Sequence, residues 1–178
     1  LEHIVPEVIE VIKVYEKSGH CKIPVIAAGG LYTGEDIYRL MQLGATGVQL
    51  GSKFVTTEEC DASPIFKQVY IDAGQSDIEI IASPVGMPGR AISGEFIRKI
   101  KSGSEKPRRC AFHCIKTCDY TKSPYCIIKA LYNAAKGNMQ KGYAFAGANA
   151  FLSQKIVSVR ETIETLKKEF RHAEEAAK

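Results

Sequence analysis

Two apolar segments of this sequence end in glycine, an arrangement that could bind a phosphate. The first, "IPVIAAGG", ends at Gly29-Gly30, and the second, "ATGVQLGS", ends at Gly51-Ser52. Main-chain N–H groups after a buried strand can approach a phosphate closely where no Cβ intervenes, which glycine allows. The Ser52 hydroxyl can add a donor, and Gln49 needs a hydrogen-bonding role in an otherwise apolar strand. The pattern predicts a site for a flavin, a nucleotide or a sugar phosphate, and glycines that only form tight turns are the alternative.

The elements around these glycines are typical of a parallel α/β architecture. The apolar runs at residues 23–28 and 46–50 are typical of strands buried on both faces of a parallel sheet. Between them, Thr33 and Asp36 form an acidic variant of the capping box and predict a helix. The N-terminus of this helix would add a positive dipole end to the phosphate site. A further helix predicted over residues 6–17 extends the unit to helix–strand–helix–strand.

These elements predict where the chain lies in a larger fold. In (β/α)₈ barrels the loops after the seventh and eighth strands form the phosphate pocket, and the two glycine loops fit those positions. The predicted fold class is therefore α/β, with residues 1–60 forming the end of a TIM barrel and its last two strands. We expect residues 61–145 to form a smaller irregular α/β lobe. Residues 146–178 are predicted to form a terminal segment and a helix that packs back on the barrel.

Composition and charge narrow the function classes. The 178 residues are 45% hydrophobic and 25% charged, as in a globular protein with a sizeable core. The net charge of +4, spread among acidic residues, gives little reason to expect nucleic acid binding. No apolar run approaches the roughly 20 residues that span a bilayer. Six cysteines without a recognisable secretion leader predict reduced thiols and a cytoplasmic protein. The chain starts at Leu1 and enters a helix almost at once, so we expect it to be part of a longer protein.

The segment "IPVIAAGGLYTGEDIYRLMQLGATGVQLGSKFVTTEE" closely resembles the C-terminal half of the nitronate monooxygenase family, formerly called 2-nitropropane dioxygenases. The FMN-dependent enoyl-ACP reductases share the same pattern. The family usually has threonine and arginine where this chain has Ser52-Lys53, so the hydroxyl is kept. The resemblance implies one site that holds the phosphate of FMN, formed by Ala28, Gly29, Gly30, Gln49, Gly51 and Ser52.

Two later segments extend this resemblance. "SPVGMPGRAI" resembles the family's Gly-x-Pro-x-Arg-Ala loop, which implies that Met87 and Arg90 lie near the substrate entrance to the flavin. "AFAGANAF" resembles a segment that usually reads Ala-Gly-Gln, but here Asn149 follows Ala148. The family's catalytic histidine belongs to a Gly-Gly-His motif on an earlier strand loop, which we expect upstream of this chain. His20 in "SGHCK" lies between a helix and a strand, on the barrel face opposite the active site, and is not expected to be catalytic.

A cysteine-rich segment, "CAFHCIKTCDYTKSPYC", contains Cys110, Cys114, Cys118 and Cys126. If residues 110–118 are helical, three of these thiols share one face. Four thiolates could hold zinc or an iron–sulfur cluster, although the C-x₂-C pairs typical of such sites are missing. The favoured interpretation is that these cysteines pack as small hydrophobic side chains. A third interpretation, after packing and metal binding, is that they are redox-active thiols.

The resemblance implies an FMN-dependent oxidoreductase that oxidises alkyl nitronates with oxygen. One alternative is an enoyl-ACP reductase, in which NAD(P)H reduces FMN first. Another is a barrel that binds a phosphorylated ligand without redox chemistry, or an inactive, partial cofactor-binding module. A small-molecule substrate and a homodimer are expected as partners, whereas nucleic acid and membrane are not.

Overall fold

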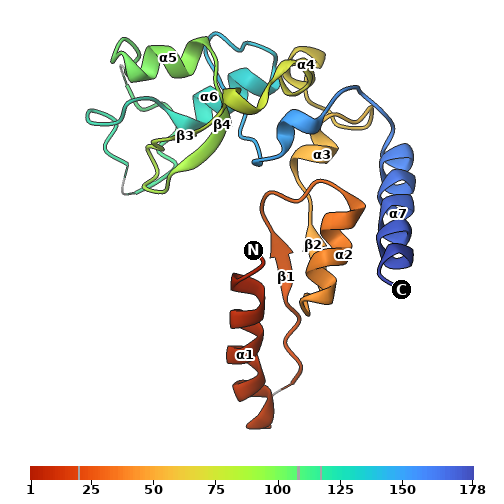
Figure 1. Cartoon of the computed structure of the whole chain (residues 1–178). Helices are drawn as coiled ribbons and strands as arrows, with labels where there is room; N and C mark the ends of the chain where they lie inside the picture. Colours follow the sequence, from red (N-terminus) through yellow and green to blue (C-terminus); the bar gives the residue numbers. More distant parts are fainter. Residues whose placement is uncertain (20, 108, 117) are drawn as a thin grey trace.

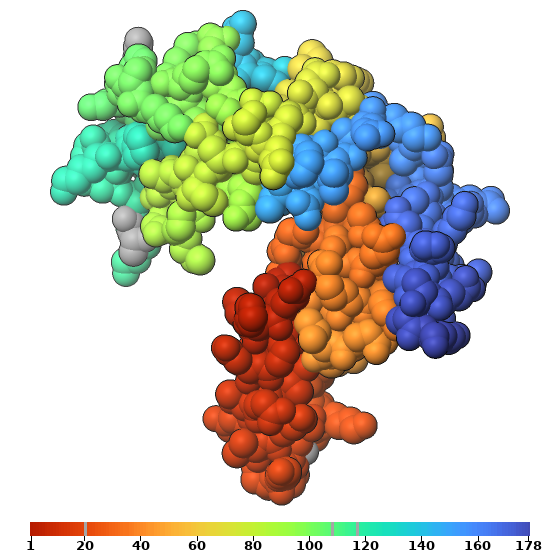
Figure 2. All heavy atoms as spheres, viewed as in Figure 1, coloured from red at the N-terminus to blue at the C-terminus, as the bar shows by residue number. Residues whose placement is uncertain are grey.

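The chain forms two lobes of mixed α/β structure (Figure 1). The structure is a computed structural model that describes residues 1–19, 21–107, 109–116 and 118–178. Figure 2 shows that the lobes meet at an angle, with the N-terminal helix at one end of the molecule. The first lobe contains α1 (Ile4–Lys17), β1 (Ile26–Ala28), α2 (Gly34–Gln42), β2 (Gly47–Gln49) and α7 (Val159–Ala176). The second contains α4 (Pro64–Asp72), β3 (Ile78–Ile81), β4 (Gly89–Ile92), α5 (Glu95–Lys101) and α6 (Ile127–Ala135). The short elements are α3 (Ser52–Val55) and two 3₁₀ turns, η1 (Gln75–Asp77) and η2 (Ala150–Leu152).

The predicted helix–strand–helix–strand order is present in the first lobe. Strands β1 and β2 pair in parallel, with Ile26 opposite Gly47. Helix α2 begins with the predicted capping box, in which the Asp36 N–H donates to Thr33 Oγ1 and the Thr33 N–H donates to Asp36 Oδ2, both at 3.1 Å. Because the strands run in the same direction, their carboxyl ends lie at the same edge of the sheet.

The burial of β1 differs from the expectation for a strand covered on both faces. Ala27 is buried, whereas the Ile26 side chain is 56% exposed. Ala27 packs on one face with Val5, Leu40 and Ala45. Within the described part of the chain, β1 pairs with β2 alone. The apolar run therefore predicted the strand correctly. The expectation that both faces of the strand are buried is wrong for the described residues, because Ile26 is exposed.

The second lobe has its own core around the antiparallel pair β3 and β4, in which Ile78 lies opposite Ile92. Phe96 of α5 meets the Tyr125 ring edge-on, with 5.7 Å between ring centroids. The Tyr125 hydroxyl donates to the Tyr143 hydroxyl at 3.1 Å. All three rings are almost completely buried, and they belong to a core cluster separate from the one around the parallel strands.

Helix α7 returns from the second lobe and packs along α2 (Figure 1). Leu166 is buried at this contact, and the rings of Tyr38 and Phe170 meet edge-on at 5.5 Å. The Gly34 N–H donates to Glu169 Oε2 at 2.7 Å. The limits of the three predicted domains stay a prediction. Among the described helices, α7 included, none has the length and apolar composition needed to cross a membrane.

The connection from α5 to α6 contains no helix or strand in its described residues, which are 102–107, 109–116 and 118–126. The helical face that would bring three cysteines together is therefore not formed. Cys110 and Cys118 are half-buried in this connection, and Cys114 is exposed.

Candidate phosphate-binding site

One pocket is lined by three segments that are far apart in the sequence. Two of them follow the parallel strands β1 and β2, and the third comprises residues 147–150. The pocket contains about 500 Å³ of empty space, including the part open to solvent. It brings together five of the six residues implied by the family resemblance to hold FMN, namely Gly29, Gly30, Gln49, Gly51 and Ser52. That these residues hold FMN stays a prediction.

The glycines leave the main chain of this pocket accessible. Gly29 and Gly30 have φ angles of +110° and +74°, a region that residues with a side chain rarely adopt. Gly51 has an ordinary φ of −112°, and a Cβ built on it meets no atom within 4 Å. The N–H groups of Ser52 and Lys53 begin α3 and therefore have no acceptor within that helix. Main-chain donors can thus be approached closely after both strands.

The third segment ties the two glycine loops together. The Gly147 N–H donates to Ser52 Oγ at 2.7 Å. Although the family's usual glutamine is missing here, Asn149 Nδ2 donates to the Gly30 carbonyl at 2.6 Å. The one sequence feature that could have indicated this contact is the amide of Asn149 among the small residues of "AGANA". Its partner, Gly30, lies 119 residues away in the sequence. Asn149 therefore positions the Gly30 loop, a role that the sequence did not predict.

Tyr32 forms the wall between this pocket and a second hollow that contains Lys53 and Glu169. Lys53 Nζ lies 4.2 Å from the centroid of the Tyr32 ring, a cation–π contact. Burial lowers the pKa of Lys53, and the carboxylates of Glu169 and Asp36 act in the opposite direction. The Tyr32 hydroxyl lies 2.7 Å from Ser153 Oγ, and burial raises its pKa. Lys53 is held against the Tyr32 ring and does not line the glycine pocket, whose described lining carries no charged side chain.

The N-terminus of α2 is used for packing and does not serve the phosphate site as expected. The Gly34 N–H donates to Glu169 of α7, and the Asp36 N–H donates to Thr33 Oγ1. Burial alone would raise the pKa of Asp36, but the N–H groups of Tyr32 and Thr33, together with the Arg39 guanidinium and the Thr33 hydroxyl, outweigh it and lower this pKa. Two carboxylates therefore already lie at the positive end of the helix. The N–H groups of Gly34 and Asp36 are therefore already bonded within the protein.

Three of the predicted site residues lie outside the pocket. Ala28 is the exposed last residue of β1, and its side chain is not part of the pocket lining. Met87 is 76% exposed in the connection between β3 and β4. Arg90 is exposed in β4, but its carbonyl accepts the Ala146 N–H at 3.0 Å, next to the segment 147–150. Arg90 therefore adjoins the pocket through the backbone, and Met87 has no comparable bond among the described contacts.

The pocket holds no strong candidate for proton transfer. Its described lining contains no aspartate, glutamate, histidine or cysteine. Tyr32 is its one phenol, and burial raises the pKa of that group. His20 lies outside the described residues. The arrangement has room for a phosphorylated ligand, and its described lining offers no carboxylate, imidazole or thiol as a catalytic base.

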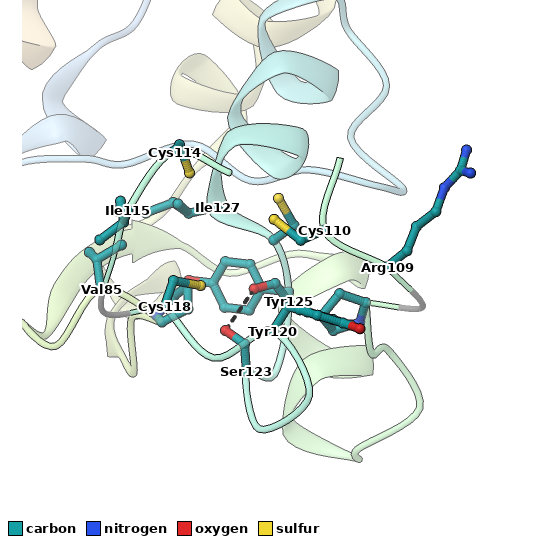
Figure 3. A pocket seen from close by; sticks show the side chains of 13 residues that line it. Val85, Arg109, Cys110, Cys114, Ile115, Cys118, Tyr120, Ser123, Tyr125 and Ile127 are labelled. Atoms are coloured by element: carbon teal, nitrogen blue, oxygen red, sulfur yellow. Dashed lines mark hydrogen bonds between the residues drawn. The ribbon is translucent and has the colours of Figure 1, made fainter. Parts of the chain in front are cut away.

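The four clustered cysteines are brought to a different place, an apolar pocket of the second lobe (Figure 3). All four are free thiols, and none is fully buried. Across the parts of the chain that the structure describes, no three Cys, His, Asp or Glu side chains are close enough to hold one metal ion. A preformed site for a single zinc ion is thus not found among these residues.

A parallel strand–helix–strand unit that opens on a glycine-lined pocket places the chain among α/β proteins that bind ligands at the carboxyl ends of their strands. The chain belongs to the nitronate monooxygenase family, whose sequence model matches residues 1–169. A probable nitronate monooxygenase of Staphylococcus saprophyticus is 40% identical over 78 residues, which are 44% of this chain and 22% of the relative. Another from Staphylococcus aureus (strain Newman) is 32% identical over 97 residues, or 54% of this chain and 25% of the relative.

Two solved structures share the fold over most of the chain. FabK from Thermotoga maritima matches with a TM-score of 0.71 and 28% identity, covering 88% of this chain and 47% of FabK. Nitroalkane oxidase from Streptomyces ansochromogenes matches with a TM-score of 0.71 and 23% identity, covering 100% of this chain and 45% of the oxidase. The second likeness shows the fold alone. The chain spans less than half the length of both structures, and the matched regions span about a quarter of the curated relatives.

Proposed function

We propose that the protein is an FMN-dependent oxidoreductase that oxidises alkyl nitronates with molecular oxygen. The observation that carries the proposal is the meeting of both glycine loops in one pocket, in a chain of the nitronate monooxygenase family. The probable nitronate monooxygenases among its relatives support the choice of substrate class.

The lining of the pocket fits the phosphate end of FMN. The space beside Gly51 would be filled by a Cβ, and the N–H groups at the start of α3 supply donors without competing acceptors in that helix. Ser52 Oγ accepts the Gly147 N–H, which leaves its own hydroxyl proton available to a phosphate oxygen. When bound, FMN supplies the redox chemistry, and these residues bind and orient it.

The substrate is proposed to approach from the side of the second lobe. Arg90 adjoins the pocket through its backbone bond to Ala146, and its guanidinium could attract an anionic nitronate. Met87 is proposed for the outer part of this approach because it is exposed in the preceding loop. The described lining of the glycine pocket offers no catalytic base, so no residue is assigned that role here.

The test uses the full-length protein, purified without added flavin. We expect flavin absorbance bands, release of FMN on denaturation identified by its mass, and oxygen uptake that depends on propionate 3-nitronate. Protein that retains no FMN after reconstitution would contradict the proposal. Colourless protein that binds a sugar phosphate instead would support the non-redox alternative.

A second candidate is the reduction of an enoyl thioester, based on the pattern shared with FMN-dependent enoyl-ACP reductases. The same preparation should then oxidise NADH in the presence of a crotonyl thioester and show no oxygen uptake with the nitronate. Measuring both reactions on one flavin-loaded sample separates these candidates without assuming which one is correct.

A further inference from the structure

We propose that Lys53 is a positioning residue, which joins the two glycine loops of the candidate flavin site through the ring of Tyr32. Tyr32 belongs to the first glycine loop, residues 29–33, and Lys53 belongs to the second, residues 51–55. Lys53 Nζ lies 4.2 Å from the centroid of the Tyr32 ring. The consequence for flavin binding rests on the proposed function, whereas the contact itself does not.

The two glycine loops are otherwise joined through a third segment. The segment 147–150 donates one hydrogen bond to each loop. Among the described hydrogen bonds, none joins residues 29–33 directly to residues 51–55. The contact between Lys53 and Tyr32 supplies a direct connection between them. The three segments that line the glycine pocket are therefore joined pairwise, and Lys53 completes the set.

Tyr32 is the residue of the first loop that this contact fixes. It is buried, and it lines both the glycine pocket and the hollow that contains Lys53. Its hydroxyl lies 2.7 Å from Ser153 Oγ, and its N–H donates to Asp36 Oδ2 at 2.9 Å. These bonds hold the hydroxyl and the backbone, while the ammonium of Lys53 lies over the face of the ring. The wall between the two spaces is thus fixed at three points, as a preorganised binding site requires.

The charge of Lys53 has no stronger partner in this hollow. Lys53 is half-buried and forms no ion pair among the described residues. The carboxylates of Glu169 and Asp36 act on its charge, but each already accepts a main-chain N–H at or just before the start of α2. Attraction between a cation and an aromatic ring strengthens where water is partly excluded. The ring of Tyr32 is therefore the favourable place for this ammonium.

A fixed first loop matters for a ligand that approaches its main chain. Gly29 and Gly30 give this loop more conformational freedom than other residues would. Ordering a loop at the moment of binding costs free energy, and a loop that is already held in place avoids this cost. Lys53 does not line the glycine pocket, so its effect on a ligand there is transmitted through Tyr32.

The first measurement is amide hydrogen exchange of Tyr32 and Thr33 in the flavin-free, full-length protein. In Lys53→Met these amides should exchange about threefold faster, because the cation over the ring is lost. Lys53→Arg should exchange as the wild type does, since a guanidinium keeps the charge and stacks on aromatic faces. Lys155→Met is the matched control: Lys155 lines the same hollow, but its ammonium pairs with Glu161 at 2.9 Å, and exchange should not change.

The second measurement is the affinity of the same four proteins for FMN and for riboflavin, which lacks the phosphate. Lys53→Met should bind FMN about threefold or more weakly, with a smaller change for riboflavin. Lys53→Arg should restore the affinity for FMN, and Lys155→Met should leave it unchanged. Circular dichroism shows whether each variant has folded.

Equal exchange, or equal FMN affinity, in the wild type and Lys53→Met would overturn the inference. An equal loss of FMN affinity in Lys53→Met and Lys155→Met would overturn it as well, because positive charge in general would then be the cause. So would exchange in Lys53→Arg as fast as in Lys53→Met. Wild-type protein that binds no FMN would contradict the proposed function instead, and the exchange measurement would then decide the inference by itself.

Discussion

At the scale of single residues, the candidate flavin site depends on positions where a side chain is absent. Gly29 and Gly30 require glycine for conformational reasons, because their φ angles are positive. Gly51 differs, since its φ is ordinary and a Cβ there meets no atom within 4 Å. Its glycine is therefore not explained by folding, and access to the main chain is the remaining physical reason.

Gly51→Ala is expected to weaken FMN binding by about tenfold or more, equivalent to about 1.4 kcal/mol, while leaving the fold intact. The added methyl group would stand between the phosphate and the N–H groups of α3. The matched control is Gly94→Ala, which also has open space around its Cβ and precedes a helix, but in the second lobe. Flavin fluorescence titration measures both, and equal FMN affinity in the two variants would contradict the explanation.

At the scale of elements, the sequence predicted the features that depend on residues close together in the chain. Thr33 and Asp36 are three residues apart, and both bonds of the predicted capping box are formed. The glycines after β1 and β2 converge because a short helical crossover makes two strands parallel. The cysteine-rich connection was not predictable in the same way, because it forms no periodic element from which the positions of its thiols could be inferred.

Asp36→Asn tests the capping box through pH. The pKa of Asp36 is lowered in the folded protein, so its carboxylate contributes stability above the unfolded pKa of about 3.9, and this contribution is lost as the pH falls through the lower folded value. We expect the variant to be less stable by about 0.3–1 kcal/mol at pH 7, with the difference fading in acid. Urea denaturation at several pH values measures this.

The control for that experiment is Glu35→Gln, which removes an exposed carboxylate from the same helical turn. It should change stability less than Asp36→Asn at pH 7. A difference between wild type and Asp36→Asn that stays constant from pH 7 to pH 2 would show that the carboxylate is not the cause.

At the scale of the whole molecule, residues from the C-terminal part of the chain contact the loop after β1 and the start of α2. Asn149 reaches the Gly30 loop across 119 residues of sequence, and Glu169 reaches Gly34 across 135. Neither contact has a local signature. The sequence therefore predicted the glycine loops and a terminal helix that packs back on the barrel, but not the side chains that make these contacts. The same return of α7 removes the N-terminus of α2 from the phosphate site, which corrects the dipole argument.

Gly34→Ala should disrupt the packing of α7 on α2. A Cβ at this position would clash with the Leu166 carbonyl and the Phe170 N–H, both backbone atoms of α7 that cannot move aside cheaply. We expect a loss of about 1–3 kcal/mol in the free energy of unfolding and faster amide hydrogen exchange in α7. Gly94→Ala serves again as the control, and unchanged exchange in α7 would contradict the close contact.

The most direct test of the central claim compares FMN with riboflavin, which lacks the phosphate, as ligands of the full-length protein. If main-chain donors at the two strand ends bind the phosphate, FMN should bind at least about tenfold more tightly than riboflavin, and Gly51→Ala should remove most of that preference. Equal affinity of the wild-type protein for both flavins, or an undiminished preference in Gly51→Ala, would contradict the account.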